Sequence, residues 1–257
     1  MDYLIICLVS LVASGLTLFS GFGLGSLLLP AFAIFFPAEV AVALTAIVHF
    51  LNNLFKLFLL GKFADKSVVL KFGIPAILAA YLGAKALLWL ADLTPIFNYH
   101  IGAKEFSIMP VNLAIGILMI IFAGIELIPD TKNFSLSDRF LPAGGILSGF
   151  FGGLSGHQGA LRTIFLLRCG LTKEAFIATG VVIACLIDTS RLVVYFGKFT
   201  AANFNENTGL LIAATLAAFI GAYAGRRLME KVTMRGVQIM VSIMLFILSL
   251  GLIFGFI

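Results

Sequence analysis

The chain has 257 residues, of which 61% are hydrophobic and only 11% are charged. Ordinary soluble domains carry about 25% charged residues, so this composition indicates an integral membrane protein and excludes a soluble one. The net charge of +5 comes from basic residues at segment ends, with no run interleaved with aromatic residues, which gives nucleic-acid binding no support. The apolar runs have helical length, which indicates an all-α protein rather than a barrel of ~10-residue strands.

The first apolar segment runs from Tyr3 to Phe36 and is interrupted by S-G-F-G-L-G-S at Ser20–Ser26. A continuous helix of this length would measure about 50 Å, against a hydrocarbon core of ~30 Å. We therefore expect the chain to fold back at these glycines, as a re-entrant or short-helix hairpin rather than two full spans. The next predicted elements are spans at Ala38–Leu60 and about Val68–Leu90, a polar and aromatic linker at Ala91–Ser107, and a span at about Pro110–Ile128.

After a connector at Asp130–Arg139, the pattern begins again with the segment Phe140–Cys169. Both ends of this segment are apolar, but glycines and polar residues fill its middle: Gly152, Gly153, Ser155, Gly156, His157, Gln158, Gly159 and Arg162. Each glycine lowers helix propensity by roughly 1 kcal/mol relative to alanine, and polar groups at membrane depth must be buried in protein. The segment therefore predicts a second broken helix. Three more spans are expected at Lys173–Phe196, Thr208–Met229 and Val237–Phe256.

Short matches between the two halves indicate an internal duplication. The sequence G-K-F occurs at Gly61–Phe63 and again at Gly197–Phe199, an offset of 136 residues (197 − 61). The same offset pairs Asn52 with Asp188, and Gly23 with Gly159. Gly83-Ala84 recurs as Gly221-Ala222 at a similar offset. Internal repeats are common in transporters, and we predict one membrane repeat at residues 1–129, a connector at 130–139 and a second repeat at 140–257.

Basic residues gather in two connections that are not equivalent in the two repeats. They are Lys56, Lys62, Lys66 and Lys71 in the first repeat, and Arg226, Arg227, Lys231 and Arg235 in the second. Because basic loops stay in the cytoplasm, both connections lie inside only if the halves are inverted. The predicted fold is thus two inverted repeats, each a glycine-broken hairpin followed by three transmembrane helices. Eight plain spans with parallel halves are the alternative.

Inverted halves would bring the helix ends of both breaks to one point near the membrane midplane. Helix N-termini present unpaired N–H groups and about half a positive charge. Arg162 follows the second break and its fork of donors suits an oxyanion. We expect a small anion to be surrounded by Arg162, His157, Gln158, Ser155 and Ser20, and we add Asn52 and Asn53, which match Asp188 and Thr189, as candidate ligands. The alternative is that the glycines serve helix packing and Arg162 extends outwards.

The buried ionisable residues are candidates for coupling to a second ion. Asp188 lies within an apolar run, where it could carry a proton or pair with Arg162 or Arg191. His157 and His49 are further proton-coupling candidates, although His49 could equally be a satisfied core histidine. Na⁺ on exposed carbonyls of the breaks is the other coupling option. We expect no metal site and no other cofactor, since the three cysteines lack metal-binding spacing.

The segments S-G-F-G-L-G-S-L-L-L-P (Ser20–Pro30) and F-G-G-L-S-G-H-Q-G-A-L-R (Phe151–Arg162), together with the duplication, resemble the TauE/SafE sulfite exporter family. The resemblance implies transport of sulfite, an organosulfonate or a related sulfur anion across a bacterial inner membrane. Carried over by motif, the site includes Gly21, Gly23, Gly25, Ser155, Gly156 and Gly159. The second motif departs from the family pattern: His157-Gln158 replaces glycines, and no proline matches Pro30. This departure leaves the particular anion open.

We therefore expect a multi-pass secondary transporter that works by alternating access and has a small sulfur-containing anion and the lipid bilayer as partners. The direction of transport is open, and so is assembly into a homodimer. A passive anion channel is one alternative function. No Ser/His/Asp, HExxH or P-loop motif is present, so we expect no enzyme activity. The remaining alternative, a membrane enzyme or assembly factor for sulfur species, depends on Cys169 as a reactive thiol at a segment end.

Overall fold

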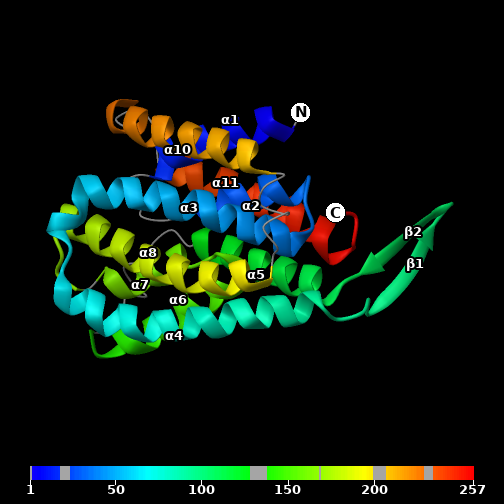
Figure 1. The fold of residues 1–257 in the computed structure, drawn as a ribbon, viewed down its shortest axis with the longest axis horizontal. Helices are drawn as coiled ribbons and strands as arrows, with labels where there is room; N and C mark the ends of the chain where they lie inside the picture. Colours follow the sequence, from blue (N-terminus) through cyan, green and yellow to red (C-terminus); the bar gives the residue numbers. More distant parts are fainter. Residues whose placement is uncertain (1, 18–23, 128–137, 168, 199–206, 229–233) are drawn as a thin grey trace.

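A computed structural model of the chain describes residues 2–17, 24–127, 138–167, 169–198, 207–228 and 234–257. Most of these residues are helical, and the longer helices run beside one another along the long axis of the molecule (Figure 1). The all-α class predicted from the sequence is thus confirmed, with one small β-hairpin as an addition.

The elements follow one another along the chain as predicted, with helices at nearly every expected segment. In order they are α1 (Asp2–Thr17), α2 (Leu24–Ala33), α3 (Ala38–Leu60), η1 (Gly61–Phe63), α4 (Lys66–Ala91), β1 (Phe97–Ile101), β2 (Lys104–Ile108), α5 (Pro110–Leu127), η3 (Asp138–Phe140), α6 (Leu141–Ser155), α7 (Gly159–Leu166), α8 (Lys173–Lys198), α10 (Thr208–Leu228) and α11 (Met234–Ile253).

Among the described residues, four stretches are long and apolar enough to cross a membrane: α3 with η1, α4, α8 and the first 18 residues of α10. Asp65 is the N-cap residue of helix α4, because its carboxylate accepts a hydrogen bond from the Val68 N–H at 2.9 Å. Helices α5 and α11 contribute shorter apolar stretches within the described residues. The two remaining full spans predicted at these helices stay predictions.

Four short helices form the arms of the two predicted hairpins. Helices α1 and α2 have 16 and 10 residues, and α6 and α7 have 15 and 8. At about 1.5 Å per residue, none of them reaches across a hydrocarbon core of ~30 Å. The predicted interruption of the segment Phe140–Cys169 is confirmed, because α6 ends at Ser155 and α7 begins at Gly159. Of the first interruption, residues 18–23 lie outside the described part of the chain.

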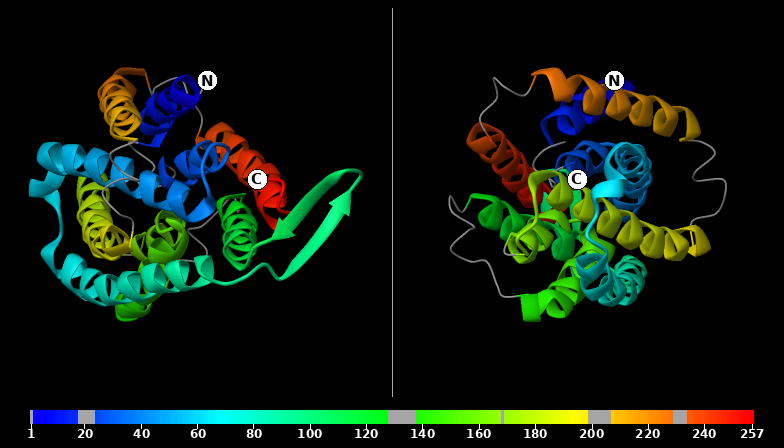
Figure 2. Two further views of the ribbon diagram at one scale, coloured as in Figure 1. Left: turned by 45° about the vertical axis from the view of Figure 1, so that its right-hand side comes forward. Right: turned by 90° about the vertical axis from the view of Figure 1, so that its left-hand side faces the viewer.

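Two helix pairs, α4 with α6 and α1 with α10, lie on opposite sides of the molecule (Figures 1 and 2). Glycines let both pairs approach closely. A Cβ on Gly83 of α4 would collide with the carbonyl oxygen of Phe150 in α6, and a Cβ on Gly221 of α10 would collide with that of Leu11 in α1. Gly83 and Gly221 are the glycines that the duplication matches. The same close contact therefore occurs at equivalent positions of the two halves.

Helices α3 and α8 pack together between these two outer pairs, and α5 packs against α11 (Figure 2). Helix α8 is fastened to α4 along its length: Thr179 accepts the Asp65 N–H at 2.9 Å, and Ser190 donates to the Ile77 carbonyl at 2.8 Å. Both α3 and α8 carry buried polar side chains toward their middle, although they are apolar elsewhere. The fold thus holds the polar faces of two central helices inside a shell of apolar ones.

A β-hairpin occupies most of the linker that the sequence indicates only as polar and aromatic. Strands β1 and β2 pair antiparallel, from Phe97 opposite Ile108 to Ile101 opposite Lys104, and project beyond the helices (Figure 1). The Tyr99 ring stacks on Phe97 and Phe106, and its hydroxyl donates to the Phe254 carbonyl. The hairpin is therefore anchored to residues that follow α11. The local sequence of the linker does not predict this contact.

Candidate functional site

The second break is a tight turn between α6 and α7. Helix α6 ends with Gly156 in the left-handed region at φ +83°, a conformation that other residues rarely adopt. Ser148 of α6 donates to the Gln158 carbonyl at 2.8 Å and fixes the far side of the turn. All the residues of the turn are buried, including His157 and Gln158. The backbone therefore turns inside the protein, where its polar groups can face a bound ligand.

The start of α2 lies against this turn. Gly25, the second residue of α2, lies so close that a Cβ there would stand 3.3 Å from the Gly156 carbonyl oxygen and 3.8 Å from the His49 ring. The start of α2 therefore lies against the second break and against α3. Of the candidate residues in the first break, Gly25 is described, whereas Ser20, Gly21 and Gly23 lie outside the described residues.

His157 is held on two sides. Its ring lies parallel to Phe122 of α5, with 5.2 Å between centroids and 4° between planes, and its Nδ1 is 3.2 Å from the Ser155 hydroxyl. The side chain is only 3% exposed, and Nε2 has no hydrogen-bond partner among the described residues. A buried polar atom without a partner is uncommon and costs about 1–3 kcal/mol. Nε2 is thus a candidate ligand contact.

Asp188 of α8 is the centre of the polar cluster and is fully buried. Its Oδ2 lies 2.7 Å from His49 Nδ1, and its Oδ1 accepts from Arg191 Nε at 3.0 Å and from Gln158 Nε2 at 3.1 Å. One carboxylate therefore joins α3, α8 and the second break. Of the two options that the sequence leaves for Asp188, pairing with Arg191 is the one observed. His49, predicted only as a core or titrating histidine, joins the same cluster.

Arg191 and Tyr195 bind carbonyls at the buried C-terminal end of α6. Arg191 Nη1 donates to the Gly152 carbonyl at 3.2 Å, and the Tyr195 hydroxyl donates to the Gly153 carbonyl. The last carbonyls of a helix lack partners within the helix, and the Tyr195 hydroxyl supplies one for Gly153. The Gly152 carbonyl also accepts from the Gly156 N–H, so Arg191 is its second donor. Tyr195 is absent from the predicted site, although its spacing from Asp188 and Arg191 puts all three on one face of α8.

Arg162 is buried, not extended outwards: it is 5% exposed, and its Nη1 donates to Gln158 Oε1 at 3.3 Å. The Asp188 carboxylate attracts its charge. The prediction that Lys56 lies at the cytoplasmic interface is wrong, because Lys56 is also 5% exposed and its charge repels that of Arg162. Lys56 is buried because α8 packs against its helix, α3.

Asn52 and Asn53 of α3 have different surroundings. Asn53 Nδ2 lies 3.1 Å and 3.3 Å from the two ring nitrogens of His49, so this amide packs against the histidine ring. Asn52 Oδ1 accepts from the Ser14 hydroxyl at 3.1 Å, while its Nδ2 has no hydrogen-bond partner among the described residues. Of the two, Asn52 therefore has a donor available to a ligand.

The balance of buried charge determines what the cluster suits chemically. Within the described residues, the buried side chains that carry a full charge are Lys56, Arg162, Arg191 and Asp188. These are three cations and one carboxylate, and the Asn52 Nδ2 donor is also buried. Burying charge without compensation costs several kcal/mol per ion. An arrangement with excess positive charge and spare donors is therefore suited to an anion.

The part of the chain that the structure describes has no group of His, Cys, Asp and Glu side chains that could hold a metal ion. Partial burial raises the pKa of the Cys169 thiol to about 11, with smaller contributions from Asp138 and Asp65. A thiol with this pKa is almost entirely protonated at neutral pH and is a poor nucleophile. This weakens the alternative that depends on Cys169 as a reactive group.

Comparison with known proteins gives a match over nearly the full length. None of the curated proteins compared matches the chain. The model of the sulfite exporter TauE/SafE family matches residues 6–252, a range that includes both hairpins and all four helices long enough to cross a membrane. The chain belongs to the TauE/SafE sulfite exporter family, a family of membrane transporters.

Proposed function

We propose that the protein is a secondary transporter that carries sulfite, an organosulfonate or a related sulfur-containing oxyanion across the bacterial inner membrane. The observation that carries this proposal is the excess of buried positive charge where the two breaks meet. Three cationic side chains and one carboxylate are buried there, on helices of a protein from a sulfite exporter family. A water-excluding site of this kind binds an anion well because its donors are already in place.

Arg162 is the central ligand in this proposal. Its planar fork can give two parallel hydrogen bonds to an oxyanion, whereas Lys56 acts as a point charge. Asn52 Nδ2 supplies a further donor, and the N-termini of α2 and α7 supply backbone N–H groups. His157 Nε2 can accept a hydrogen bond from a protonated oxygen of the anion, because Nδ1 donates to the Ser155 hydroxyl, which itself donates to the Phe151 carbonyl. Gln158 links Arg162 to Asp188 and holds both in position. Ser20, Gly21, Gly23 and Gly25 would complete the site from the first break.

The arrangement of helix pairs supports two repeats related by a pseudo-two-fold axis. The pair α4–α6 has its counterpart in the pair α10–α1, and the pairs α3–α8 and α5–α11 each join equivalent helices of the two halves. In our proposal the repeats are inverted, with the basic connections at η1 and at residues 226–235 in the cytoplasm. Rocking of one repeat against the other would then open the site to each side in turn.

We further propose that a proton on His49 accompanies the anion. His49 lies on α3 and Asp188 on α8, so their 2.7 Å contact joins the two repeats. A protonated His49 adds positive charge beside the site, and it therefore favours anion binding. Na⁺ held by carbonyls of the breaks is the alternative coupling ion.

The test is uptake of radiolabelled sulfite into proteoliposomes that contain purified protein. We expect Arg162→Ala to lower the flux at least ~100-fold, since it removes a charged, bidentate contact from a buried site. Arg162→Lys should recover only part of the flux. Arg139→Ala is the matched control, because Arg139 is exposed in η3, far along α6 from the break, and it should transport normally.

Full flux in Arg162→Ala would remove this arginine from the transport path and overturn the proposed site. The same vesicles test the coupling when an inward proton gradient is imposed. A gradient should accelerate wild-type uptake, and His49→Gln should transport without responding to it. A Na⁺ gradient that drives uptake while the proton gradient does not would contradict the role given to His49. Flux that never saturates with substrate would indicate a passive channel instead.

A further inference from the structure

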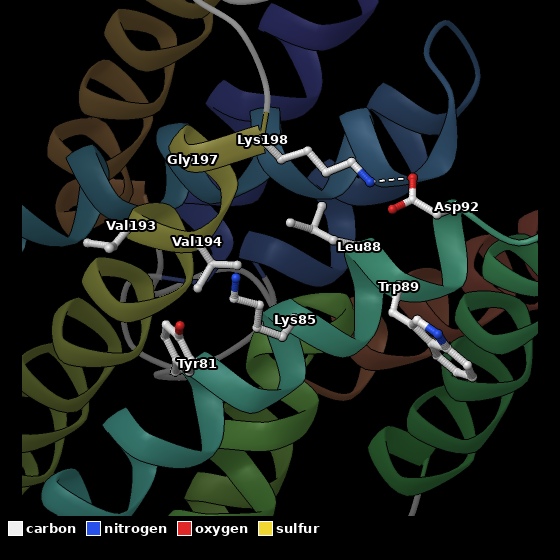
Figure 3. Close-up of a pocket in the computed structure, with 9 residues that line it drawn as sticks. All are labelled: Tyr81, Lys85, Leu88, Trp89, Asp92, Val193, Val194, Gly197 and Lys198. Atoms are coloured by element: carbon white, nitrogen blue, oxygen red, sulfur yellow. Dashed lines mark ion pairs between the residues drawn. The ribbon is translucent and has the colours of Figure 1, made fainter.

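A groove of about 440 Å³ lies between the last turns of α4 and α8, away from the buried cluster (Figure 3). Its lining combines two lysines, one carboxylate, two amphipathic aromatic residues and apolar side chains: Tyr81, Lys85, Leu88, Trp89, Asp92, Val193, Val194, Gly197 and Lys198. Leu88 and Val194 are buried and form its floor, whereas Val193 on its rim is 65% exposed. The groove therefore opens outwards, toward the surroundings of the helices.

The groove carries a net positive charge. Lys198 forms an ion pair with Asp92 across it, as the dashed line in Figure 3 marks. Lys85 extends into the space between the two helices with its ammonium 5.7 Å from the centre of the Tyr81 ring. Among the described residues Lys85 makes no ion pair. The charge of Lys198 is thus compensated by Asp92 within the groove, and Lys85 is available to an anion.

The groove lies at the level of lipid headgroups if α4 and α8 cross the membrane. Each helix has 26 residues and is therefore about 39 Å long, against a hydrocarbon core of ~30 Å. The last turns stand in the headgroup layer, where aromatic residues such as Trp89 are enriched. Lys85 lies six residues before the end of α4, about 9 Å along the helix axis, and its ammonium stands on the Tyr81 side of the groove.

Exposed apolar side chains continue from the groove along α4. Ile74, Leu78 and Leu82 are 57%, 67% and 60% exposed, and they lie on the membrane-core side of Lys85 along the helix. A small free anion would leave these side chains without a role. A phospholipid would place its phosphate beside the lysines and its acyl chains along this surface. A lipid therefore accounts for both the lysines of the groove and the exposed apolar side chains of α4.

We propose that this groove binds the phosphate headgroup of an anionic phospholipid, with Lys85 as the principal contact. The Asp92–Lys198 pair limits the affinity, because Asp92 neutralises the second lysine and repels a phosphate. The site is separate from the anion cluster at Asp188 and Arg162, and it does not depend on the proposed transport function. A bound lipid would join the ends of α4 and α8, helices that belong to different proposed repeats.

Trp89 offers a local probe, because it is the single tryptophan of the chain and it lines the groove. The experiment reconstitutes the full-length protein in bilayers that contain increasing fractions of a brominated lipid, whose chains quench tryptophan fluorescence on contact. Brominated phosphatidylglycerol is compared with brominated phosphatidylcholine that has the same chains. We expect half-maximal quenching at an about five-fold lower fraction of the anionic lipid, the preference expected for one lysine near the membrane surface.

Lys85→Gln should abolish this preference, and Asp92→Asn should increase it, since it frees Lys198 while keeping the side-chain size. Lys104→Gln is the matched control: it removes a lysine on the exposed β-hairpin and should behave like the wild type. Arg162→Ala should also keep the preference, which separates this site from the transport site. Equal quenching by the two lipids, or an unchanged preference in Lys85→Gln, would overturn the proposal. So would displacement of the anionic lipid by millimolar inorganic phosphate, which would indicate a site for free anions.

Discussion

The two broken hairpins occupy matching places in the duplicated chain but differ in chemistry. In the first hairpin, every residue of α2 is buried and none is charged. In the second, α7 carries Arg162, and the turn before it carries His157 and Gln158. Both hairpins have short arms, and the outer arm of each packs against a long helix of the other half through glycine contacts. The close glycine contacts thus occur in both predicted halves, whereas the buried charged side chains come mainly from the second.

The central helices show the same contrast. At matched positions, α8 has the charged Asp188, where α3 has the neutral Asn52. The first half still contributes His49 and Lys56, so neither half forms the cluster alone. In our proposal, the predicted repeats keep similar packing while the proposed anion site differs between them. It also predicts that matched substitutions have equal effects in the scaffold and unequal effects in the site.

The largest difference is expected between Asp188→Ala and Asn52→Ala. Asp188→Ala leaves Arg191 buried without its carboxylate, and such a change typically lowers the free energy of unfolding by about 3–5 kcal/mol. Asn52→Ala removes one neutral hydrogen bond, with Ser14, which is worth about 1 kcal/mol. Denaturant titration of the two purified variants in detergent measures both losses. If Asp188→Ala does not fold, Asp188→Asn gives the same comparison in milder form. Equal losses of unfolding free energy at Asp188 and Asn52 would contradict the proposed difference between the two halves.

For Gly83→Leu and Gly221→Leu, by contrast, we expect similar effects on stability, because both glycines make the same kind of close helix contact. Each added side chain would collide with a carbonyl of the neighbouring helix, and overpacking of this kind costs about 1–3 kcal/mol or more. We expect the two losses, measured as shifts in melting temperature, to be similar. Gly124→Leu in α5 is the control, since a Cβ at Gly124 meets nothing within 4 Å. A large loss at only one of the matched glycines would show that the repeated contact is not structurally equivalent.

A smaller effect concerns Cys169, which follows α7 at the end of the second hairpin. With its pKa raised to about 11, only about one thiol in a thousand is ionised at pH 8. Because the thiolate is the reactive form, alkylation by a maleimide should be slow and should accelerate about tenfold per pH unit between pH 7 and 10. Stopped-time labelling followed by mass spectrometry measures the rate. Fast labelling at pH 7 would show that the end of this hairpin opens readily.

Local sequence is sufficient to predict the second break, because four glycines and a His-Gln pair interrupt an otherwise apolar run over only a few residues. The pairing of Asp188 with Arg191 is likewise a local effect, since the two residues are one turn apart on α8. The strands of the β-hairpin are visible in hindsight as the alternation F-N-Y-H-I and K-E-F-S-I. Each strand has only five residues, and such short runs are difficult to distinguish from a linker.

Contacts between residues far apart in the chain could not be predicted in this way. The approach of Gly25 to Gly156 joins residues 131 positions apart (156 − 25), and nothing local to either residue indicates it. The burial of Lys56 has the same origin, because a lysine near the end of an apolar helix usually reaches the membrane interface. The burial arises from the packing of α3 against other helices, among them α8.

The most direct test of the site is to locate a bound anion. Selenite is a heavier chemical analogue of sulfite. Near its absorption edge, its selenium atom gives a much stronger anomalous X-ray signal than the atoms of the protein. Crystals of the protein soaked in selenite should show one strong anomalous peak where the two breaks meet, within hydrogen-bonding distance of Arg162 and His157 Nε2. A peak elsewhere, with none at this junction, would contradict the account.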